Sequence, residues 1–385
     1  MRIQSINNFY TYNNITPKAR NSYRSNISNP QLTTDTFIKQ PAFCGKKSAA
    51  KDAIKQLEDT LKNIDNLHDP YSDIIMLPNN KFKSIMKRMN NKRDASSAVK
   101  YLSKFRRYMF SSEEKVLNML EEHQHDTYKD ATGKTLPTNF HTILTHLLPA
   151  AKVRLVNTQL DVVENMRNIS KKKLSKLSQN DVESYLTIIE KDIMHDRFRI
   201  KPSKDLLARL YDEVPDKKVV DEIMKATRDF PNSATSTDAF IVKNAGKTHH
   251  AIAEALLSPS TITVEHIKPS SKGGEDKGTN YLAASKRMNN YRSSIPITEF
   301  IKMFPKIPQY TQLYMNDLIG KANRGGIPDI ADSIIGVKDC LNKESKGKLN
   351  VDISKLDPKI VEQTQALQDK IDSLISRFNP KKKKK

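Results

Sequence analysis

Apolar residues recur every three or four positions through most of this chain, and this period constrains the fold more than any other feature. In the segment 48–230, for example, Ile54, Leu57, Leu61 and Ile64 lie on one face of a helix. Further helical patterns follow, with no internal repeat that we detect. The period therefore predicts a mainly α-helical protein.

Several helices are predicted individually. The patterns at 136–148 and 151–169 predict two separate helices, and Ser111 with two early glutamates indicates a capped helix start. A helix is also expected at 49–67. Residues 358–378 repeat with coiled-coil spacing, but over only about three heptads. This short length favours docking on the chain's own helices, and a dimeric coiled coil is the alternative.

The character of the sequence changes near residue 230, where Asn, Ser, Thr and Pro accumulate. A short helical pattern and a β-branched run, "STITVEHI", come next, and helical patterns return after residue 294. We therefore divide the chain into a disordered N-terminal arm (1–47), a helical domain of unknown role (48–230), a small hairpin and helix unit embedded in the helical fold (231–296), a C-terminal helical region (297–378) and a Lys-rich tail (379–385).

The charge balance points to a polyanionic partner. The formal net charge is +21, which favours nucleic acid before anionic lipid. Two runs, "KFKSIMKRMNNKR" (81–93) and "KFRRYMF" (104–110), interleave Lys and Arg with aromatic residues, as a surface that follows phosphates does. The alternative is that an AT-rich genome enriches Lys, Asn and Ile and that most lysines only solvate the surface.

Cysteine usage and hydropathy limit the compartment. Cys44 and Cys340 are the only cysteines, which excludes a disulfide scaffold and a cysteine zinc ribbon. No apolar run approaches the roughly 20 residues of a membrane span, and the N-terminus lacks the order of a secretory signal. We therefore expect a cytoplasmic protein with no membrane partner.

The residues that carry chemistry gather in "TVEHIKPSSKGGEDKGTN", residues 263–280. A strand ending at His266, a Gly-rich loop, a second short strand "NYLAA" and the polar helix "SKRMNNYRSS" predict a hairpin followed by a helix. Such a unit can bring Glu265 and His266 opposite Asn289 on the helix.

Those three side chains suit metal-assisted phosphodiester hydrolysis. Mg²⁺ prefers oxygen ligands and needs only one or two protein groups beside a substrate phosphate, and Glu265 and Asn289 supply two such oxygens. His266, with an ordinary pKa of about 6.5, is suited to take a proton from the attacking water at neutral pH.

The stretch at 258–294 resembles the HNH endonuclease motif, the ββα-metal nuclease fold. The shared features are a Glu-His-Ile, a Gly-Gly turn, Asn280 at 14 positions after His266, and Asn289 at 9 positions after Asn280. The resemblance implies DNA cleavage with a divalent metal, Mg²⁺ or Mn²⁺. It also implies that Glu265 and Asn289 bind the metal, that His266 is the general base, and that Asn280 holds the loop beneath the histidine.

The sequence departs from the family pattern in three places. Many members bind a structural zinc through cysteine pairs, but Ser285 and Met288 stand at the matching helix positions, so no structural zinc is expected. Glu265 replaces the commoner aspartate. Asn290 adjoins Asn289, although the spacing favours Asn289.

Further candidates are assigned to nucleic-acid binding. Arg292 falls where family members often carry Lys, and Lys272, Lys286 and Arg287 lie within the motif. The adjacent pair His249 and His250, on a predicted helix just before the motif, forms another candidate, against the commoner interpretation of solvated surface histidines.

Two other functions stay open. One is a non-catalytic nucleic-acid-binding or scaffold protein that keeps a degenerate HNH hairpin, and the other is a toxin-like effector nuclease. Neither the target sequence, the choice of DNA over RNA nor the oligomeric state follows from the residues.

Overall fold

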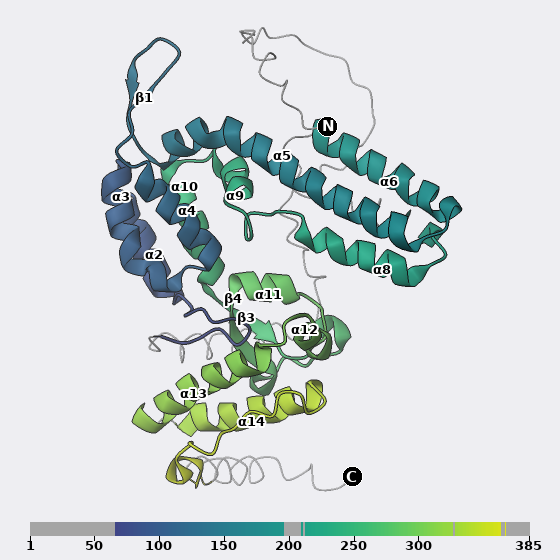
Figure 1. Ribbon diagram of the computed structural model, residues 1–385. Helices are drawn as coiled ribbons and strands as arrows, with labels where there is room; N and C mark the ends of the chain where they lie inside the picture. The colour runs from purple at the N-terminus through teal and green to yellow at the C-terminus, as the bar shows by residue number, and fades with distance from the viewer. Residues whose placement is uncertain (1–65, 196–208, 211, 326–327, 363–365, 367–385) are drawn as a thin grey trace, which may run out of the picture. The chain divides into compact units, whose positions relative to one another are not determined.

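The computed structural model describes residues 66–195, 209–210, 212–325, 328–362 and 366. Most of these residues lie in helices, as the sequence predicts (Figure 1). The predicted arm, nearly all of the predicted helix at 49–67, most of the 358–378 pattern and the Lys-rich tail lie outside the described residues. In the described part of the chain, no helix is both long and apolar enough to cross a membrane.

The first described helices form a compact group. They are α2 (Asn79–Met89), α3 (Ala95–Leu102), the 3-10 helix η1 (Ser103–Tyr108) and α4 (Ser111–Glu122). The Asp94 side chain begins α3 by accepting a hydrogen bond of 2.8 Å from the backbone N–H of Ser97. The prediction for α4 was partly wrong, because the capping residue is Phe110 and no side chain caps this helix.

A small hairpin that the sequence did not predict follows α4. Its strands, β1 (Tyr128–Lys129) and β2 (Thr135–Leu136), pair antiparallel over only two residues each. The turn between them contains Gly133 with a φ of +83°, and the Asp130 carboxylate accepts the N–H of Thr132. Strands this short leave too little alternation to be read from a sequence.

One long helix, α5 (Phe140–Lys173), replaces the two helices predicted at 136–148 and 151–169. It continues through Pro149, a residue that removes one helix hydrogen bond. The helix survives because both of its halves are packed. The first half contacts α9 (Thr237–Asn244) and α10 (His249–Leu257), and the second half lies alongside α6 (Lys176–His195) and α8 (Lys217–Ala226) (Figure 1).

Helix α9, which the sequence did not predict, lies just after residue 230, where the sequence changes character and where we place a domain limit. After the 3-10 helix η2 (Thr227–Asp229), the Ser236 side chain caps α9, and Phe240 and Ile241 are buried. The remaining described elements are η3 (Ser258–Ser260), β3 (Ile262–His266), η4 (Ser270–Lys272), η5 (Gly278–Asn280), β4 (Tyr281–Ser285), α11 (Lys286–Arg292), α12 (Ile297–Met303), α13 (Ile307–Gly325) and α14 (Pro328–Glu344).

Buried apolar side chains form three cores. The hairpin core joins β3, β4, α11, α12, α13 and α14 with the segment Leu67–Met76. The α2–α4 core joins α2, α3, α4 and the start of α5 with α9 and α10. The α6–α8 core joins the second half of α5 with α6, α8 and Phe230. The predicted domain limits stay predictions, but the first two cores draw side chains from both sides of residue 230.

The segment Leu67–Leu77, far from the hairpin in the sequence, binds to both strands of the hairpin unit. Its buried Asp69 carboxylate accepts the backbone N–H of Ser285 at 2.9 Å, and Leu77 forms a parallel bridge with Thr261. His68 contacts the Asp317 carboxylate on α13 at 2.8 Å. An irregular segment therefore holds the junction of β4 and α11 in place.

Candidate active site

Strands β3 and β4 form the predicted hairpin, and α11 follows directly. The strands pair antiparallel with Glu265 opposite Leu282 and His266 opposite Tyr281. Ser285 ends β4 and caps α11, since its hydroxyl accepts the backbone N–H of Met288 at 3.4 Å. The positions that the family pattern implies for zinc ligands are thus a cap, Ser285, and a hairpin-core residue, Met288.

The two adjacent glycines of the loop are both required. Gly273 has a φ of +79°, a left-handed conformation that other residues rarely adopt. At Gly274 a Cβ atom would lie 1.9 Å from the backbone oxygen of Lys268. The loop can therefore turn back toward β4 only with glycine at both positions.

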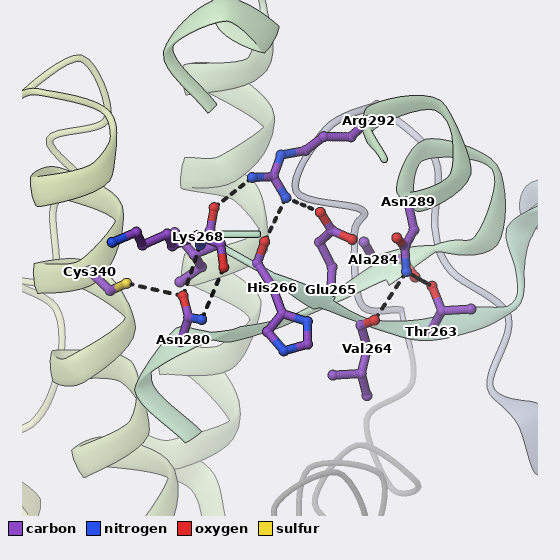
Figure 2. A network of polar contacts seen from close by, with 11 residues as sticks. Thr263, Val264, Glu265, His266, Lys268, Asn280, Ala284, Asn289, Arg292 and Cys340 are labelled. Atoms are coloured by element: carbon purple, nitrogen blue, oxygen red, sulfur yellow. Dashed lines mark hydrogen bonds and ion pairs between the residues drawn. The ribbon is translucent and has the colours of Figure 1, made fainter. Parts of the chain in front are cut away.

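Asn280 holds this loop closed (Figure 2). Its buried side chain accepts the backbone N–H of Lys268 at 2.8 Å and donates to the backbone oxygens of Lys268 and Glu275 at 3.2 and 2.9 Å. The Cys340 thiol on α14 contacts the same amide oxygen at 3.6 Å. The asparagine thus ties both ends of the loop together directly after His266.

His266 is the accessible chemical group of the hairpin, with 23% of its side chain exposed. Its Nε2 lies 3.0 Å from the Asp276 carboxylate, and the Tyr281 hydroxyl donates to the same carboxylate oxygen at 3.0 Å. The His266 ring packs edge to face against Tyr281. Because a carboxylate only accepts, Nε2 carries the proton and Nδ1 carries the lone pair.

The pKa values of the neighbours reflect these hydrogen bonds. The bond from His266, with a smaller contribution from Tyr281, lowers the pKa of the Asp276 carboxyl. Burial, and then the bond to Asp276, raises the pKa of the Tyr281 hydroxyl to about 12. Asp276 therefore stays ionised, and Tyr281 stays a donor, across the physiological range of pH.

Glu265 is buried and paired, with a relative exposure of 4%. One oxygen of its carboxylate accepts a hydrogen bond from Arg292 Nη1. The Arg292 guanidinium also donates to the backbone oxygens of His266 and Ile267 at 2.6 and 2.5 Å. This set of bonds, the β3–α11 clasp, fixes the end of the strand to the end of the helix (Figure 2).

The assignment of Arg292 to nucleic-acid binding requires correction. Its side chain is completely buried, so its guanidinium does not reach a phosphate at the surface. The β-strand oxygens and the Glu265 carboxylate take its donors, and only Nε lacks a partner among the described residues. Burial of this kind is not visible in a motif that places Lys or Arg at this position.

Asn289, and not Asn290, faces the strand. Its amide nitrogen donates to the Thr263 hydroxyl at 2.9 Å and to the Val264 backbone oxygen at 3.1 Å, whereas Asn290 is exposed. In the described part of the chain no donor contacts the amide oxygen of Asn289. That oxygen is available as a ligand.

The three predicted catalytic side chains do not converge. Consecutive residues of a strand point to opposite faces, and Figure 2 places the Glu265 carboxylate and Asn289 on one side of β3 and the His266 ring on the other. The hairpin pattern in the sequence predicts that all three lie opposite one another. The strand alternation divides them into an oxygen pair and a histidine.

The oxygen pair suits a hard cation. One oxygen of the Glu265 carboxylate and the Asn289 amide oxygen have no partner in the described residues, and both are donor types that Mg²⁺ and Mn²⁺ accept. No group of three or more His, Cys, Asp or Glu that could hold a metal occurs in the described segments. A metal here would therefore keep most of its water ligands.

The other basic candidates lie in different settings. Lys272 is exposed in the hairpin loop and Lys286 is half-buried at the start of α11. Arg287 is engaged with the Ser112 hydroxyl and the buried Glu113 carboxylate, and it stacks on Phe110 at 4.2 Å. Arg287 therefore joins α11 to α4, which leaves Lys272 as the freely accessible cation of this set.

The histidine pair before the motif does not approach the hairpin residues. His249 packs on Phe140, and its Nδ1 accepts the backbone N–H of Phe140 at 3.1 Å, so it joins α10 to α5. Burial lowers the pKa of His249, which favours the neutral ring that this bond requires. His250 is half-buried at the start of α10.

Sequence reasoning missed two carboxylates. Asp276 lies in the loop "GGEDKG", close to the Gly-Gly turn and ten positions after His266. That placement could have indicated a carboxylate partner for the histidine. Asp69 lies more than two hundred residues before Ser285, and no local pattern links them. Burial raises the pKa of Asp69 to about 7, although hydrogen bonds from Ser72 and Ser285 act against this rise.

Comparisons of the chain with protein-family models, curated proteins and solved structures gave no match. The function must therefore be inferred from the residues of the hairpin and their surroundings.

Proposed function

We propose that this protein is a divalent-metal-dependent nuclease of the HNH type that hydrolyses phosphodiester bonds in DNA. The observation that carries the proposal is the His266–Asp276 pair at the end of β3, within a strand, loop, strand and helix order that matches the family's spacing. Nδ1 of His266 carries the lone pair of the ring, and 23% of the His266 side chain is exposed.

In this proposal His266 acts as the general base. Nδ1 takes a proton from the attacking water, and the Asp276 carboxylate stabilises the imidazolium that results. Asn280 and the two glycines keep the loop that carries Asp276 in register with the histidine. The exposed Lys272 in the same loop is suited to contact a substrate phosphate.

Glu265 and Asn289 are the residues that would hold the metal. A bound Mg²⁺ or Mn²⁺ supplies Lewis-acid stabilisation of the charge on the leaving oxygen. Glu265 and His266 leave β3 on opposite faces, and Asn289 of α11 lies on the Glu265 side. The conformation at the end of this strand therefore has to change for all three side chains to act on one phosphate.

A non-catalytic nucleic-acid-binding or scaffold protein is the second candidate. The observation in its favour is the β3–α11 clasp, in which the Arg292 guanidinium neutralises the Glu265 carboxylate and weakens its attraction for a cation. In that case the hairpin is a structural unit and the basic surfaces do the binding.

Plasmid nicking tests the proposal. Purified protein is incubated with supercoiled plasmid in Mg²⁺ or Mn²⁺, with EDTA as the metal-free control, and His266→Ala is compared with His125→Ala, an exposed histidine outside the hairpin. We expect metal-dependent nicking that His266→Ala reduces at least about 100-fold and His125→Ala leaves unchanged, with duplex binding retained by both.

The outcome that favours the scaffold is equally specific. Salt-sensitive duplex binding with no cleavage of plasmid, single strands or RNA in either metal would contradict the nuclease proposal. Cleavage that survives His266→Ala would place the catalytic group elsewhere in the chain.

A further inference from the structure

Two cations converge on one buried tyrosine in the α2–α4 core. The Tyr108 hydroxyl accepts a hydrogen bond from Lys81 Nζ at 2.9 Å and another from Arg107 Nη2 at 2.7 Å. Both cations also lie over the Tyr108 ring, at 5.0 and 4.8 Å from its centre. We call these three residues the Tyr108 cluster.

The cluster has no counter-charge among the described residues. No carboxylate there pairs with Lys81 or Arg107, whereas Arg106, the neighbour of Arg107 in the chain, contacts Glu121 at 2.5 Å and Glu114 at 3.7 Å. A neutral oxygen therefore holds two positive charges close together. Their repulsion is an energetic cost that an anion between them would remove.

The three side chains of the cluster differ in burial. Tyr108 has 1% of its surface exposed, Lys81 is half-buried and Arg107 is exposed. Packing of the tyrosine in the core sets the position of its hydroxyl, and the hydroxyl in turn orients the two cations. An oriented pair of donors loses less entropy on binding a ligand than two free surface side chains do.

The cluster lies between two contacts that fasten α2 and α4 to the hairpin unit. Asn79, two residues before Lys81, donates to the backbone oxygen of Ile262 at 3.1 Å. On the other side, Arg287 of α11 donates to the hydroxyl of Ser112, at the start of α4, at 3.0 Å. In the sequence, Lys81 is therefore two residues from the first contact, at Asn79, and Arg107 is five residues from the second, at Ser112.

We propose that Lys81 and Arg107, oriented by Tyr108, bind a backbone phosphate of nucleic acid. The choice of ligand rests on charge and continuity, since the exposed Lys83, Lys87 and Arg88 extend the positive charge along α2, as a phosphodiester chain requires. The proposal deepens the nuclease function by naming a substrate contact outside the hairpin. It rests on that function only for the identity of the substrate.

Binding of a fluorescein-labelled DNA duplex, followed by fluorescence anisotropy over a series of salt concentrations, tests the site. The double variant Lys81→Gln/Arg107→Gln is compared with Lys225→Gln/Arg228→Gln, which removes the same charge from two exposed residues of α8 and η2. We expect the first variant to bind about 10-fold more weakly and to lower the slope of log K against log salt by about 1 to 2. The control is expected to change affinity less than about 3-fold.

A variant that keeps the net charge separates orientation from bulk charge. Tyr108→Phe removes the oxygen that gathers the two cations and leaves the ring, and Tyr185→Phe, whose hydroxyl contacts Glu213 on the surface, is its matched control. We expect weaker duplex binding only in Tyr108→Phe. Thermal melts identify any variant that fails to fold, and if Tyr108→Phe does so, the double charge variant decides.

The outcomes separate this site from the nuclease proposal. Equal losses of affinity and slope in the two charge variants would overturn the site, even if plasmid nicking is intact. If only the Tyr108 cluster variant loses duplex affinity and the protein does not nick plasmid, the phosphate site is supported and the nuclease proposal is contradicted. A stronger effect of Lys81→Gln/Arg107→Gln on binding to phosphatidylglycerol vesicles than on binding to the duplex would overturn nucleic acid as the ligand.

Discussion

At the scale of single residues, the pair of His266 and Asp276 decides what the hairpin can do. Asp276 fixes the tautomer of the imidazole and leaves the lone pair on Nδ1, and Tyr281 donates to the same carboxylate. A histidine held in this way loses little rotational freedom when a proton is transferred. The orientation of the ring therefore depends on one loop carboxylate.

Replacing this carboxylate by an amide tests that dependence. We expect Asp276→Asn to slow plasmid nicking about 10-fold or more, because an amide stabilises the imidazolium less and permits the other tautomer. Glu275→Gln is the matched control, since Glu275 is the adjacent acid and its carboxylate pairs with the exposed Lys277. Equal effects of the two substitutions on nicking rates would contradict the role of Asp276.

The residues of the hairpin were predictable to different degrees. The spacing of His266, Asn280 and Asn289 was sufficient to place them on a strand, a loop end and a helix, because these positions follow from local patterns. The role of Arg292 was not predictable, since the same residue type serves at a surface or in a buried pair. Its burial involves a residue outside the motif, since Arg292 Cζ lies 5.8 Å from the ring centre of Tyr71 in the Leu67–Leu77 segment.

At the scale of elements, the β3–α11 clasp holds a strand and a helix together with a buried ion pair. Removing one partner leaves the other charge buried without compensation, which typically costs about 3 to 5 kcal/mol. We expect Arg292→Met to lower the free energy of unfolding by about this amount in urea titrations, whereas Arg324→Met on the exposed face of α13 is expected to change it by less than about 0.5 kcal/mol.

A second substitution checks the cause. Adding Glu265→Gln to Arg292→Met removes the uncompensated charge, so the double variant is expected to recover part of the lost stability. A double variant less stable than Arg292→Met would show that packing of the arginine, and not its charge, holds the clasp.

Asp69 predicts a pH dependence of stability. Its pKa rises from 3.8 to about 7 on folding, so between those values the folded protein retains a proton that the unfolded chain has released. The contribution of Asp69 to the free energy of unfolding therefore falls as pH rises from about 4 to about 7, by up to about 4 kcal/mol, and is constant above that range. Asp69→Asn places an uncharged amide at this position and removes this dependence of stability on pH.

Urea unfolding at pH 5 and pH 8 measures the effect. We expect the stability of Asp69→Asn relative to the unsubstituted protein to increase between the two pH values, while Asp73→Asn, an exposed acid of the same segment, shows no such increase. Parallel changes in the two variants would contradict a raised pKa at Asp69.

The sequence predicted the presence of most helices better than it predicted where each helix begins and ends. Periodicity located α6, α10 and α13 because each has a buried stripe along one face. It divided α5 at Pro149, since the sequence does not reveal that two different cores hold the two halves of one helix. It missed α9, whose short length and mixed polarity give no clear period.

At the scale of the whole described chain, α5 is shared by two cores that otherwise use different residues. The α2–α4 core takes its residues Phe140 to Ala151, and the α6–α8 core takes Val162 to Met166. Because the α6–α8 core is built from one continuous stretch of chain, we expect it to open separately from the hairpin.

Hydrogen exchange with a core truncation tests this separation. Leu186 is fully buried on α6, and Leu186→Ala is expected to cost about 2 to 4 kcal/mol and to speed amide exchange in α6 and α8 while leaving β3, β4 and plasmid nicking unchanged. Leu256→Ala on α10, in the α2–α4 core, is the comparison. Faster exchange throughout the chain in Leu186→Ala would show a single cooperative unit.

The fastening of the hairpin by the Leu67–Leu77 segment has a consequence for synthesis. His68 meets Asp317 across a sequence separation of 249 residues. A ribosome adds about 5 to 20 residues per second, so this segment waits roughly 12 to 50 s for its partner. Contacts between residues so far apart in the sequence also slow folding. The hairpin can reach its final form only when translation has passed α13, so its residues are synthesised before the partner that completes this contact.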